Sequence, residues 1–159
     1  MPDLLIRPAT PDDIPAVAQR LAAMVQAMEQ MGGFRAAPFA TVVDLFQTRI
    51  RERLARDTFC YQVAALDDGI VGVTEASIIE MGGVFEPRWI LHIHGIYVDE
   101  SVRRQGIGQQ LMESALAWGR EHGCDLAELN VLVNNPARHL YEQTGFQMYQ
   151  YQMSRPIIL

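Results

Sequence analysis

The feature that most constrains the fold is a change of hydrophobic period near residue 100. Residues 89–98, "WILHIHGIYV", have the apolar content and length of a strand, whereas residues 106–122 carry apolar side chains at helical spacing. A glycine-containing turn, "RRQGIG", joins the two segments. A strand that passes through such a turn into an amphipathic helix is typical of domains that mix strands and helices. This junction therefore favours a mixed α/β domain.

The segments before this junction continue the mixed pattern. A short strand is expected in "LLIRPAT", and apolar positions 14, 17, 21, 24, 25 and 28 predict a helix that ends at the glycine pair 32–33. A second helix is expected from about Thr41 to Arg56. Two strands, "TFCYQVAAL" and "GIVGVTEASII", are joined at Asp67–Asp68–Gly69, which indicates a hairpin.

The segments after the junction read as strand, helix and strand. "LAELNVLV" is expected to be a strand, and "NNPARHLYEQTG" a short helix with Asn135 as N-cap, Pro136 at the first helical position and Gly145 at its end. "FQMYQYQM" alternates and is expected to form a final strand. The order of elements predicts a single α/β domain over residues 1–159.

Composition limits the classes of partner. The 159 residues, 49% of them apolar, are enough for one sizeable core but few for two domains. The formal net charge of −6 argues against general attraction to nucleic acid or to an anionic membrane. The N-terminal stretch lacks the apolar core of a signal peptide, and no window has the length of a membrane-spanning helix, so we expect a cytoplasmic protein. Cys60 and Cys124 are then expected to be reduced.

The turn "RRQGIG" has the chemistry of an anion-binding site. Because it opens a helix, the N–H groups of the first helical turn have no internal acceptor and point outward. Gly106 and Gly108 lack the Cβ atoms that would hold a phosphate away from the backbone, and Arg103 and Arg104 add positive charge. Taken alone, such a turn also occurs where only packing requires it. It matches neither common nucleotide-binding loop, since no G-K-[ST] follows and the three-glycine dinucleotide spacing is absent.

A second motif, "NVLVNNPARHLYEQTGF", places Asn134 just before the predicted helix and Tyr141 inside it, one turn before a Gly–Phe exit. Together with "VDESVRRQGIG", this pattern resembles the GNAT superfamily of acyl-coenzyme A-dependent N-acyltransferases. The resemblance is closest over residues 89–147, and the element order and the opening "IRPATPDD" extend it weakly to the rest of the chain.

The resemblance implies a mixed, mostly antiparallel central sheet flanked by helices, with acetyl-coenzyme A (acetyl-CoA) as co-substrate and no metal. The main-chain N–H groups of residues 103–109 would hold the diphosphate, and the backbone of residues 96–98 would pair with the pantetheine arm. Asn134 would contact that arm near its sulfur, and Tyr141 would protonate the leaving thiolate. Without the resemblance, Asn134 could simply begin a helix, and Tyr141 could be a core residue. The implied cofactor-binding residues are Ile96, Tyr97, Val98, Arg103, Arg104, Gln105, Gly106, Ile107, Gly108, Gln109, Asn134 and Tyr141.

Two histidines, His92 and His94, occupy alternate positions of the predicted strand. Alternation places them on one face together with Ile90, Ile96 and Val98. This "H-x-H" strand is similar to that of the arylalkylamine N-acetyltransferases, in which paired histidines are implicated in removing a proton from the amine. An amine with a pKa of about 10 is almost entirely ammonium at neutral pH, whereas imidazole accepts a proton there. The sequence therefore predicts at least one of the two histidines as the general base.

Three other interpretations of these motifs stay open. The histidines could be core side chains with hydrogen-bonded nitrogens. An H-x-H pair also presents zinc ligands, with Glu75, His122, His139 or a cysteine as the third, but none stands in a recognised metal spacing. The chain could also bind an acyl-CoA without turning it over, as a sensor or partner module. An assay of free thiol release would separate such a module from an enzyme.

The acceptor is expected between the first two helices and the loop before the strand at residues 89–98. These segments carry apolar side chains with carboxylates nearby, which suits a cationic amine with an apolar body, although Met and Phe at helical spacing also build cores. We expect a small-molecule amine or a protein amino group as acceptor, no nucleic-acid or membrane partner, and leave a homodimer open. The predicted substrate-binding residues are Met28, Phe34, Glu80 and Trp89.

Overall fold

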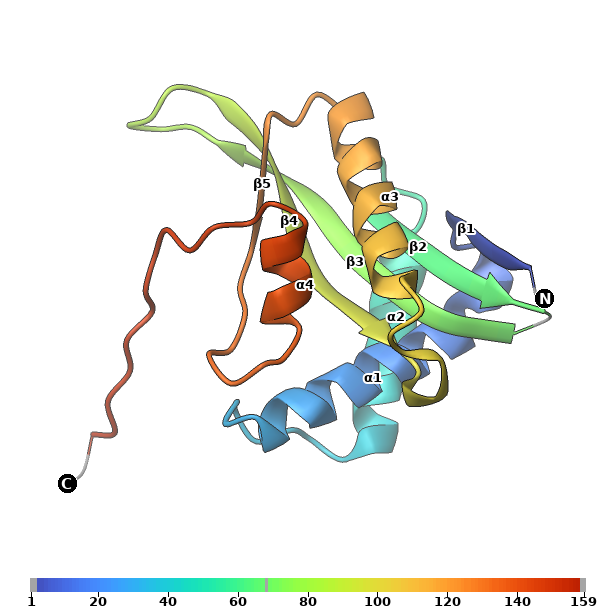
Figure 1. Ribbon diagram of the computed structural model, residues 1–159. Helices are drawn as coiled ribbons and strands as arrows, with labels where there is room; N and C mark the ends of the chain where they lie inside the picture. The colour runs from blue at the N-terminus through green and yellow to red at the C-terminus, as the bar shows by residue number, and fades with distance from the viewer. Residues whose placement is uncertain (1–2, 68, 158–159) are drawn as a thin grey trace.

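A computed structural model describes residues 3–67 and 69–157 of the chain (Figure 1). Within those residues, five strands form one sheet and helices lie against it, which confirms the expected α/β class. The elements are β1 (Leu4–Pro8), η1 (Pro11–Asp13), α1 (Ile14–Gln30), α2 (Phe39–Arg53), β2 (Phe59–Leu66), β3 (Gly69–Met81), β4 (Arg88–Val98), η2 (Glu100–Val102), α3 (Ile107–Glu121), β5 (Leu126–Leu129) and α4 (Arg138–Gln143).

The strands lie in the order β1-β2-β3-β4-β5, so neighbours in sequence are also neighbours in space. The first four strands pair antiparallel. β5 pairs parallel with β4, because the chain crosses over through α3 before it returns to the sheet. The predicted mixed, mostly antiparallel sheet is confirmed. β5 ends the sheet, and only Ile90–Ile93 of β4 pair with it.

Helices cover both faces of the sheet, with α3 and α4 in front of it in Figure 1. The residues buried between α1, α2 and one face include Ile14, Val17, Leu21, Phe46, Ile50, Val63 and Val73. The residues buried between the other face, α3 and α4 include Ile93, Ile107, Leu111, Met112 and Tyr141. The helical members recur every three or four residues, as amphipathic helices require. Among the described residues, no helix has the length and apolarity needed to cross a bilayer.

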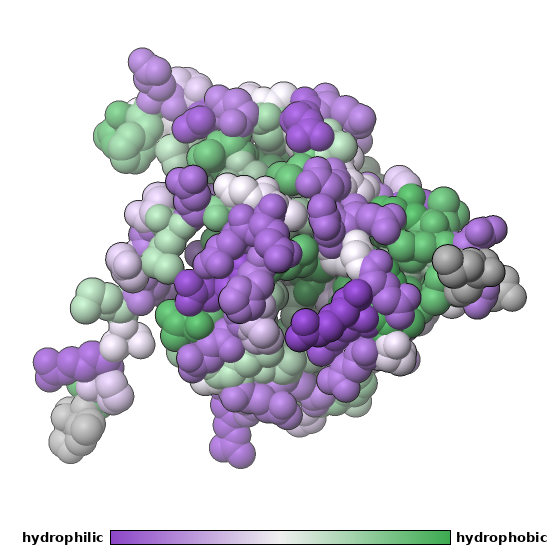
Figure 2. Space-filling model, viewed as in Figure 1, coloured by the Kyte–Doolittle hydropathy of each residue, from purple (hydrophilic) through white to green (hydrophobic). Residues whose placement is uncertain are grey.

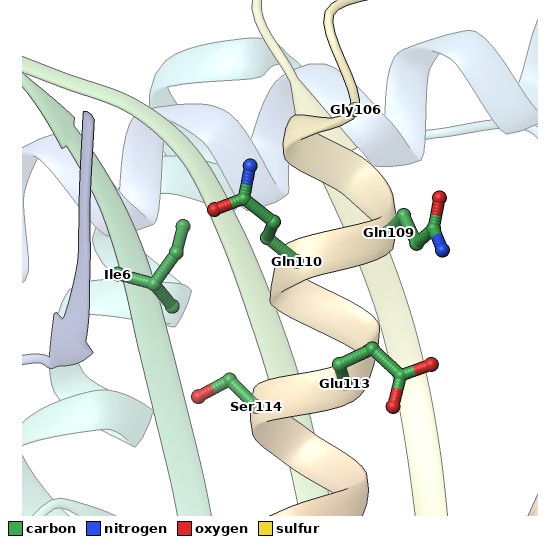
Figure 3. A pocket seen from close by; sticks show the side chains of 6 residues that line it. All are labelled: Ile6, Gly106, Gln109, Gln110, Glu113 and Ser114. Atoms are coloured by element: carbon green, nitrogen blue, oxygen red, sulfur yellow. The ribbon is translucent and has the colours of Figure 1, made fainter.

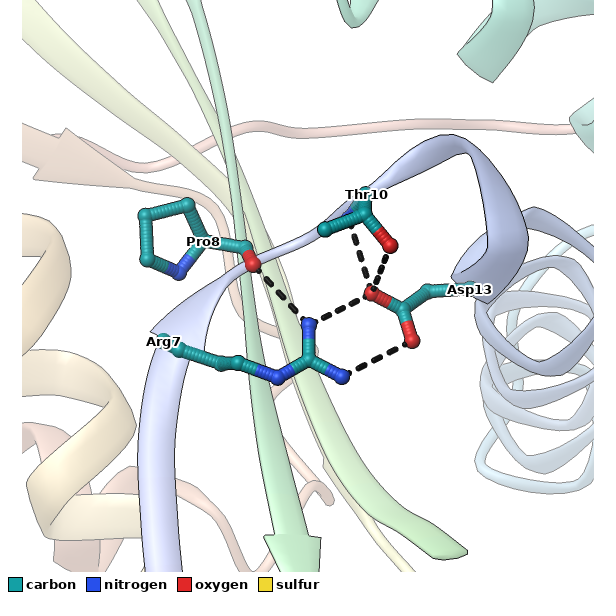
Figure 4. A network of polar contacts seen from close by, with 4 residues as sticks. All are labelled: Arg7, Pro8, Thr10 and Asp13. Atoms are coloured by element: carbon teal, nitrogen blue, oxygen red, sulfur yellow. Dashed lines mark hydrogen bonds and ion pairs between the residues drawn. The ribbon is translucent and has the colours of Figure 1, made fainter.

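A polar network ties the end of β1 to the start of α1 (Figure 4). The Arg7 guanidinium donates to both carboxylate oxygens of Asp13, at 2.6 Å and 3.0 Å. Asp13 also accepts from the Thr10 N–H at 2.7 Å and the Thr10 hydroxyl at 3.0 Å. The Arg7 hydrogen bonds are the main reason that the pKa of Asp13 falls to about 2. The network therefore fixes the edge strand against α1 as long as Asp13 is ionised.

Several element ends differ from the sequence prediction. The second helix spans Phe39–Arg53 rather than about residues 41–56. Asp68 of the predicted hairpin turn lies outside the described residues, but the flanking strands pair antiparallel as expected. The helix predicted from Pro136 begins two residues later, because the Asn135 side chain accepts the Ala137 N–H at 2.9 Å and forms a local turn first.

The predicted final strand, residues 146–153, is wrong. Residues 146–157, here called the C-terminal arm, carry no strand or helix and extend away from the body (Figure 1). β5 similarly ends at Leu129 rather than at residue 133. The alternating pattern indicates a segment that is able to form a strand, but a strand also needs a neighbouring strand to which its main chain can hydrogen-bond. Among the described residues, none pairs with the arm.

Candidate functional site

A β-bulge in β4 shapes the centre of the sheet. Glu75 of β3 pairs with Gly95, and the next position of β3 pairs with Ile93, so His94 is the extra residue of β4. The bulge shifts the alternation of side chains, because Ile93 before it and Ile96 after it both pack on the α3 face.

The prediction that Ile96 and Val98 share a face with the histidines is therefore wrong. Both residues pack with the α3 cluster instead, since the inserted residue reverses the alternation beyond it. His92 and His94 do lie together, with ring centroids 4.8 Å apart in an edge-on arrangement.

β4 and β5 separate beyond the end of their pairing. Their parallel register ends at Ile93 and Leu129. From His94 to Val98, the main chain of β4 has β3 on one side and, among the described residues, no strand on the other. An open edge of this kind presents N–H and C=O groups to an extended ligand. The predicted pantetheine-binding residues, Ile96, Tyr97 and Val98, all lie on this edge.

The open edge leads into the start of α3. Of the main-chain N–H groups predicted to hold a diphosphate, that of Arg103 donates to the Glu100 carbonyl at 3.4 Å, whereas those of residues 104–109 have no acceptor within the described chain, as expected where a turn opens a helix. Arg104 and Gly106 both adopt the left-handed conformation, with φ values of 62° and 78°. For a non-glycine residue this conformation costs about 1 kcal/mol or more. The N–H groups are thus directed by a constrained backbone, which suits an anion.

Gly108 has a packing role in addition to the predicted one. A Cβ atom on Gly108 would lie 3.1 Å from Cδ2 of Leu140 on α4 and 3.9 Å from the Val98 side chain. A substitution there would displace Leu140 as well as obstruct a bound anion. A Cβ atom on Gly106 would have no other atom within 4 Å. The left-handed φ, rather than a lack of space, therefore favours glycine at this position.

Two other arginines hold the loop between β4 and α3. Arg103 Nε donates to the Val98 carbonyl at 2.8 Å, and its guanidinium lies 5.5 Å from the Tyr97 ring centroid. Arg20 of α1 donates to the Asp99 carboxylate at 2.6 Å. Of the two arginines predicted to bind phosphate, Arg103 is therefore turned toward the end of the strand.

α4 packs Tyr141 against β4. The residue is 8% exposed and lies in the cluster that contains Ile93, with the Phe146 ring centroid at 6.3 Å. Burial raises the pKa of Tyr141, so the phenol stays protonated at neutral pH, as a proton donor must. No described residue hydrogen-bonds to its hydroxyl. Asn134 is exposed in the loop before α4 and lines an open cavity of about 270 Å³.

The two histidines have different partners. His92 Nδ1 lies 3.2 Å from Oε1 of Glu128 on β5, and His94 Nε2 lies 2.8 Å from the Ser77 hydroxyl. Burial is the largest cause of the lowered pKa of His94; together with smaller contributions from His92, Arg53 and Arg49 it outweighs the attraction of Glu75. Within residues 3–67 and 69–157, no three His, Cys, Asp or Glu side chains are grouped to hold a metal ion.

A buried polar cluster lies beside the histidines, and of its members only Glu75 was considered from the sequence, as a possible third zinc ligand. The Glu75 carboxylate, 3% exposed, accepts from the Tyr61 hydroxyl at 2.8 Å and from Arg53 Nη1 at 3.1 Å. Burial, followed by the Glu75 charge, raises the pKa of Tyr61. The only signal in the sequence was a glutamate inside an apolar strand, and spacing does not reveal that its partner comes from α2.

The four predicted acceptor residues are not gathered into one wall. Met28 lies near the end of α1, and Phe34 follows in the loop before α2, where it is 95% exposed. Glu80 and Trp89 pair across β3 and β4 next to the hairpin loop, which Figure 1 shows far from the α1–α2 loop.

A cavity of about 450 Å³ lies along one flank of α3 (Figure 3), and two of its lining residues, Gly106 and Gln109, belong to the predicted cofactor-binding turn. Gln110 and Ser114 point toward Ile6 of β1, and Gly106 lies just before the first residue of α3. None of its lining residues belongs to the histidine or Glu75 clusters.

Known proteins share this fold and part of this sequence. The profile of the acetyltransferase (GNAT) family matches residues 22–146. An uncharacterised N-acetyltransferase of Archaeoglobus fulgidus is 36% identical over 89 residues, which are 55% of this chain and 60% of that protein. The matched part thus falls short of two thirds of that relative's length.

Two solved structures are similar over almost the whole chain. A GCN5-related N-acetyltransferase from Ralstonia eutropha has a TM-score of 0.77 and 28% identity, covering 98% of this chain and 99% of that one. The aminoglycoside N-acetyltransferase AAC(6')-Iy in complex with CoA has a TM-score of 0.80 and 18% identity, covering 99% and 96%.

Proposed function

Because the chain belongs to the acetyltransferase (GNAT) family, we propose that it transfers an acetyl group from acetyl-CoA to a primary amine. Acetyl-CoA supplies the acetyl group as an activated thioester. Both substrates bind together in this proposal, and the amine attacks the thioester directly. The observation that carries the proposal is the continuous surface formed by the open edge of β4 and the unpaired N–H groups that begin α3.

The residues of this surface fit coenzyme A in chemistry and in order. The open edge from Ile96 to Val98 suits the amide-bearing pantetheine arm, because both are extended and carry hydrogen-bonding main-chain groups. The N–H groups of residues 104–109 suit the diphosphate. Arg104 is exposed and available to a phosphate, and we assign to Asn134, which is exposed in the loop before α4, a contact with the pantetheine arm.

We assign proton removal from the amine to the histidine pair, with His92 as the base. When His92 Nδ1–H donates to Glu128, the lone pair of the ring is left on Nε2. The lowered pKa of His94 favours the neutral form of that ring, so His94 adds little positive charge against a cationic amine. Tyr141 donates its phenol proton to the coenzyme A thiolate as that thiolate leaves.

The acceptor in this proposal is a small-molecule amine, and a protein amino group is the alternative. AAC(6')-Iy, with the same fold, is an aminoglycoside N-acetyltransferase, which supports a small cationic acceptor.

The test is a coupled assay of turnover. The protein is incubated with acetyl-CoA and representatives of each amine class, free thiol is measured, and the N-acetyl product is identified by mass spectrometry. We expect thiol release that depends on the amine and equals the acetylated product. Tight CoA binding without amine-dependent release would support a non-catalytic acyl-CoA sensor instead.

A further inference from the structure

Glu128 lies where β4 and β5 begin to separate. The two strands pair in parallel with His92 beside Glu128, one residue before the pairing ends at Ile93 and Leu129. His92 Nδ1 and Glu128 Oε1 lie 3.2 Å apart, within the range of an N–H···O hydrogen bond. The two side chains are 17% and 22% exposed. A largely buried carboxylate therefore faces one nitrogen of the histidine at the start of the open edge of β4.

The two histidines differ in the kind of group that holds them. The partner of His92 is the Glu128 carboxylate, whereas that of His94 is the Ser77 hydroxyl, 2.8 Å from Nε2. An ionised carboxylate only accepts hydrogen bonds, so a neutral ring that bonds to it carries its proton on the contacting nitrogen. A hydroxyl both donates and accepts, so it suits either tautomer of His94. Of the two rings, only His92 therefore has its tautomer fixed by its partner.

We propose that Glu128 is a positioning residue for the base, because its carboxylate fixes the tautomer and the orientation of His92. Glu128 thereby makes His92, rather than His94, the ring that takes the proton from the amine. This inference rests on the proposed acetyl transfer and adds the residue that selects the base. In hydrolytic triads a carboxylate orients the catalytic histidine in the same way, and an amide in its place lowers turnover because it allows the wrong tautomer.

The second oxygen of the Glu128 carboxylate has a partner of its own. Oε2 accepts from the Tyr149 hydroxyl at 3.3 Å. Tyr149 is 76% exposed and belongs to the C-terminal arm, which projects from the body at the lower left of Figure 2 as a mixture of hydrophobic and hydrophilic residues. The contact between Glu128 and His92 uses the other oxygen, Oε1, so it does not depend on the arm.

The tautomer of His92 tests the inference in the absence of any substrate. In protein with nitrogen-15-labelled histidines, the ring resonances report which nitrogen holds the proton, and His92→Gln assigns them. At a pH of about 9, where an ordinary imidazole is neutral, we expect the wild-type ring to be protonated on Nδ1. Glu128→Gln should move part of the population to Nε2, because an amide also donates and can pair with an unprotonated Nδ1. The control Tyr149→Phe should leave the proton on Nδ1.

Turnover with an amine acceptor gives a second readout. Glu128→Gln should lower kcat by about 10- to 100-fold, a part of the roughly 10²- to 10⁴-fold that a general base contributes, with little change in the KM for acetyl-CoA. The matched control Asp125→Asn makes the same change from acid to amide three residues earlier. It removes only an exposed ion pair with Arg88 at 2.8 Å, so it should turn over at the parent rate.

The possible results separate this inference from the proposed function. A wild-type His92 protonated on Nε2, or a tautomer that Glu128→Gln leaves unchanged, would overturn the role of Glu128 whatever the activity. Parent turnover of Glu128→Gln, with chemistry limiting the rate, would overturn it as well. Absence of thiol release with every amine would instead refute the proposed acetyl transfer, and the nitrogen-15 spectra would still decide whether Glu128 fixes the ring.

Discussion

Replacement of Tyr141 by phenylalanine separates the proposed proton donor from the packing of the ring. The ring is 8% exposed in the cluster between β4, α3 and α4, and Tyr141→Phe keeps it. No described residue hydrogen-bonds to the hydroxyl, so its loss leaves no protein group without a partner. We therefore expect the free energy of unfolding to change by less than about 0.5 kcal/mol, whereas Tyr141→Ala should cost about 3–5 kcal/mol as a cavity mutation.

The expected effect on turnover follows from the chemistry of the leaving group. A coenzyme A thiol, with a pKa of about 8.5–9, leaves tolerably as a thiolate, so a proton donor helps without being indispensable. Loss of the donor should reduce kcat by roughly 10- to 1000-fold, which corresponds to about 1.4–4 kcal/mol of barrier. Because burial raises the pKa of Tyr141, the ratio of wild-type to variant rates should stay constant across neutral pH.

The assay compares kcat, the affinity for CoA and the melting temperature of wild type and variant. An acyl donor with a more acidic thiol should shrink the difference in kcat, since a better leaving group needs less protonation. If Tyr141→Phe turns over at the parent rate while chemistry limits the rate, then Tyr141 is a packing residue and the proton comes from elsewhere.

Three further predictions address the scaffold and the base. Asp13→Asn should cost at most about 2 kcal/mol at neutral pH, because the pKa of Asp13 is depressed from 3.8 to about 2. That stability is present above pH 3.8 and is lost as the pH falls toward about 2, so the melting temperatures of variant and wild type should converge there; a gap that persists would contradict the role of the Arg7 pair. Arg20→Met releases Asp99 and should raise the KM for acetyl-CoA several-fold with a smaller effect on kcat, and an unchanged KM would show that the ion pair does not position the loop. His92→Ala with His94→Ala should depress turnover most near neutral pH and recover in alkali, where the amine deprotonates unaided; a uniform loss would indicate structural damage.

Local signals in the sequence were sufficient for most elements and for the start of α3. The strand, glycine turn and helix around Gly106 depend on residues close in the chain, so periodicity and turn chemistry define them. The same holds for Tyr141, whose short helix is bounded by recognisable turn residues. The roles of these residues in binding and catalysis stay predictions.

The features that were missed depend on contacts between distant segments. The bulge at His94 arises from the register between β3 and β4, which alternation along β4 alone does not encode. Glu75 is paired by Arg53 from α2, and His92 by Glu128 from β5. The prediction of a final strand was wrong for a related reason: among the described residues, no strand lies beside the alternating segment 146–153.

The central claim is that main-chain groups of β4 and of the turn before α3 hold coenzyme A. The most direct measurement is a titration of the isotopically labelled protein with CoA, followed by the amide resonances in NMR spectra. We expect the largest shifts at residues 96–98 and 104–109, with the diphosphate-binding amides moved downfield by new hydrogen bonds. Shifts confined to the α3 flank at Gln110 and Ser114, or no shifts at saturation, would contradict the account.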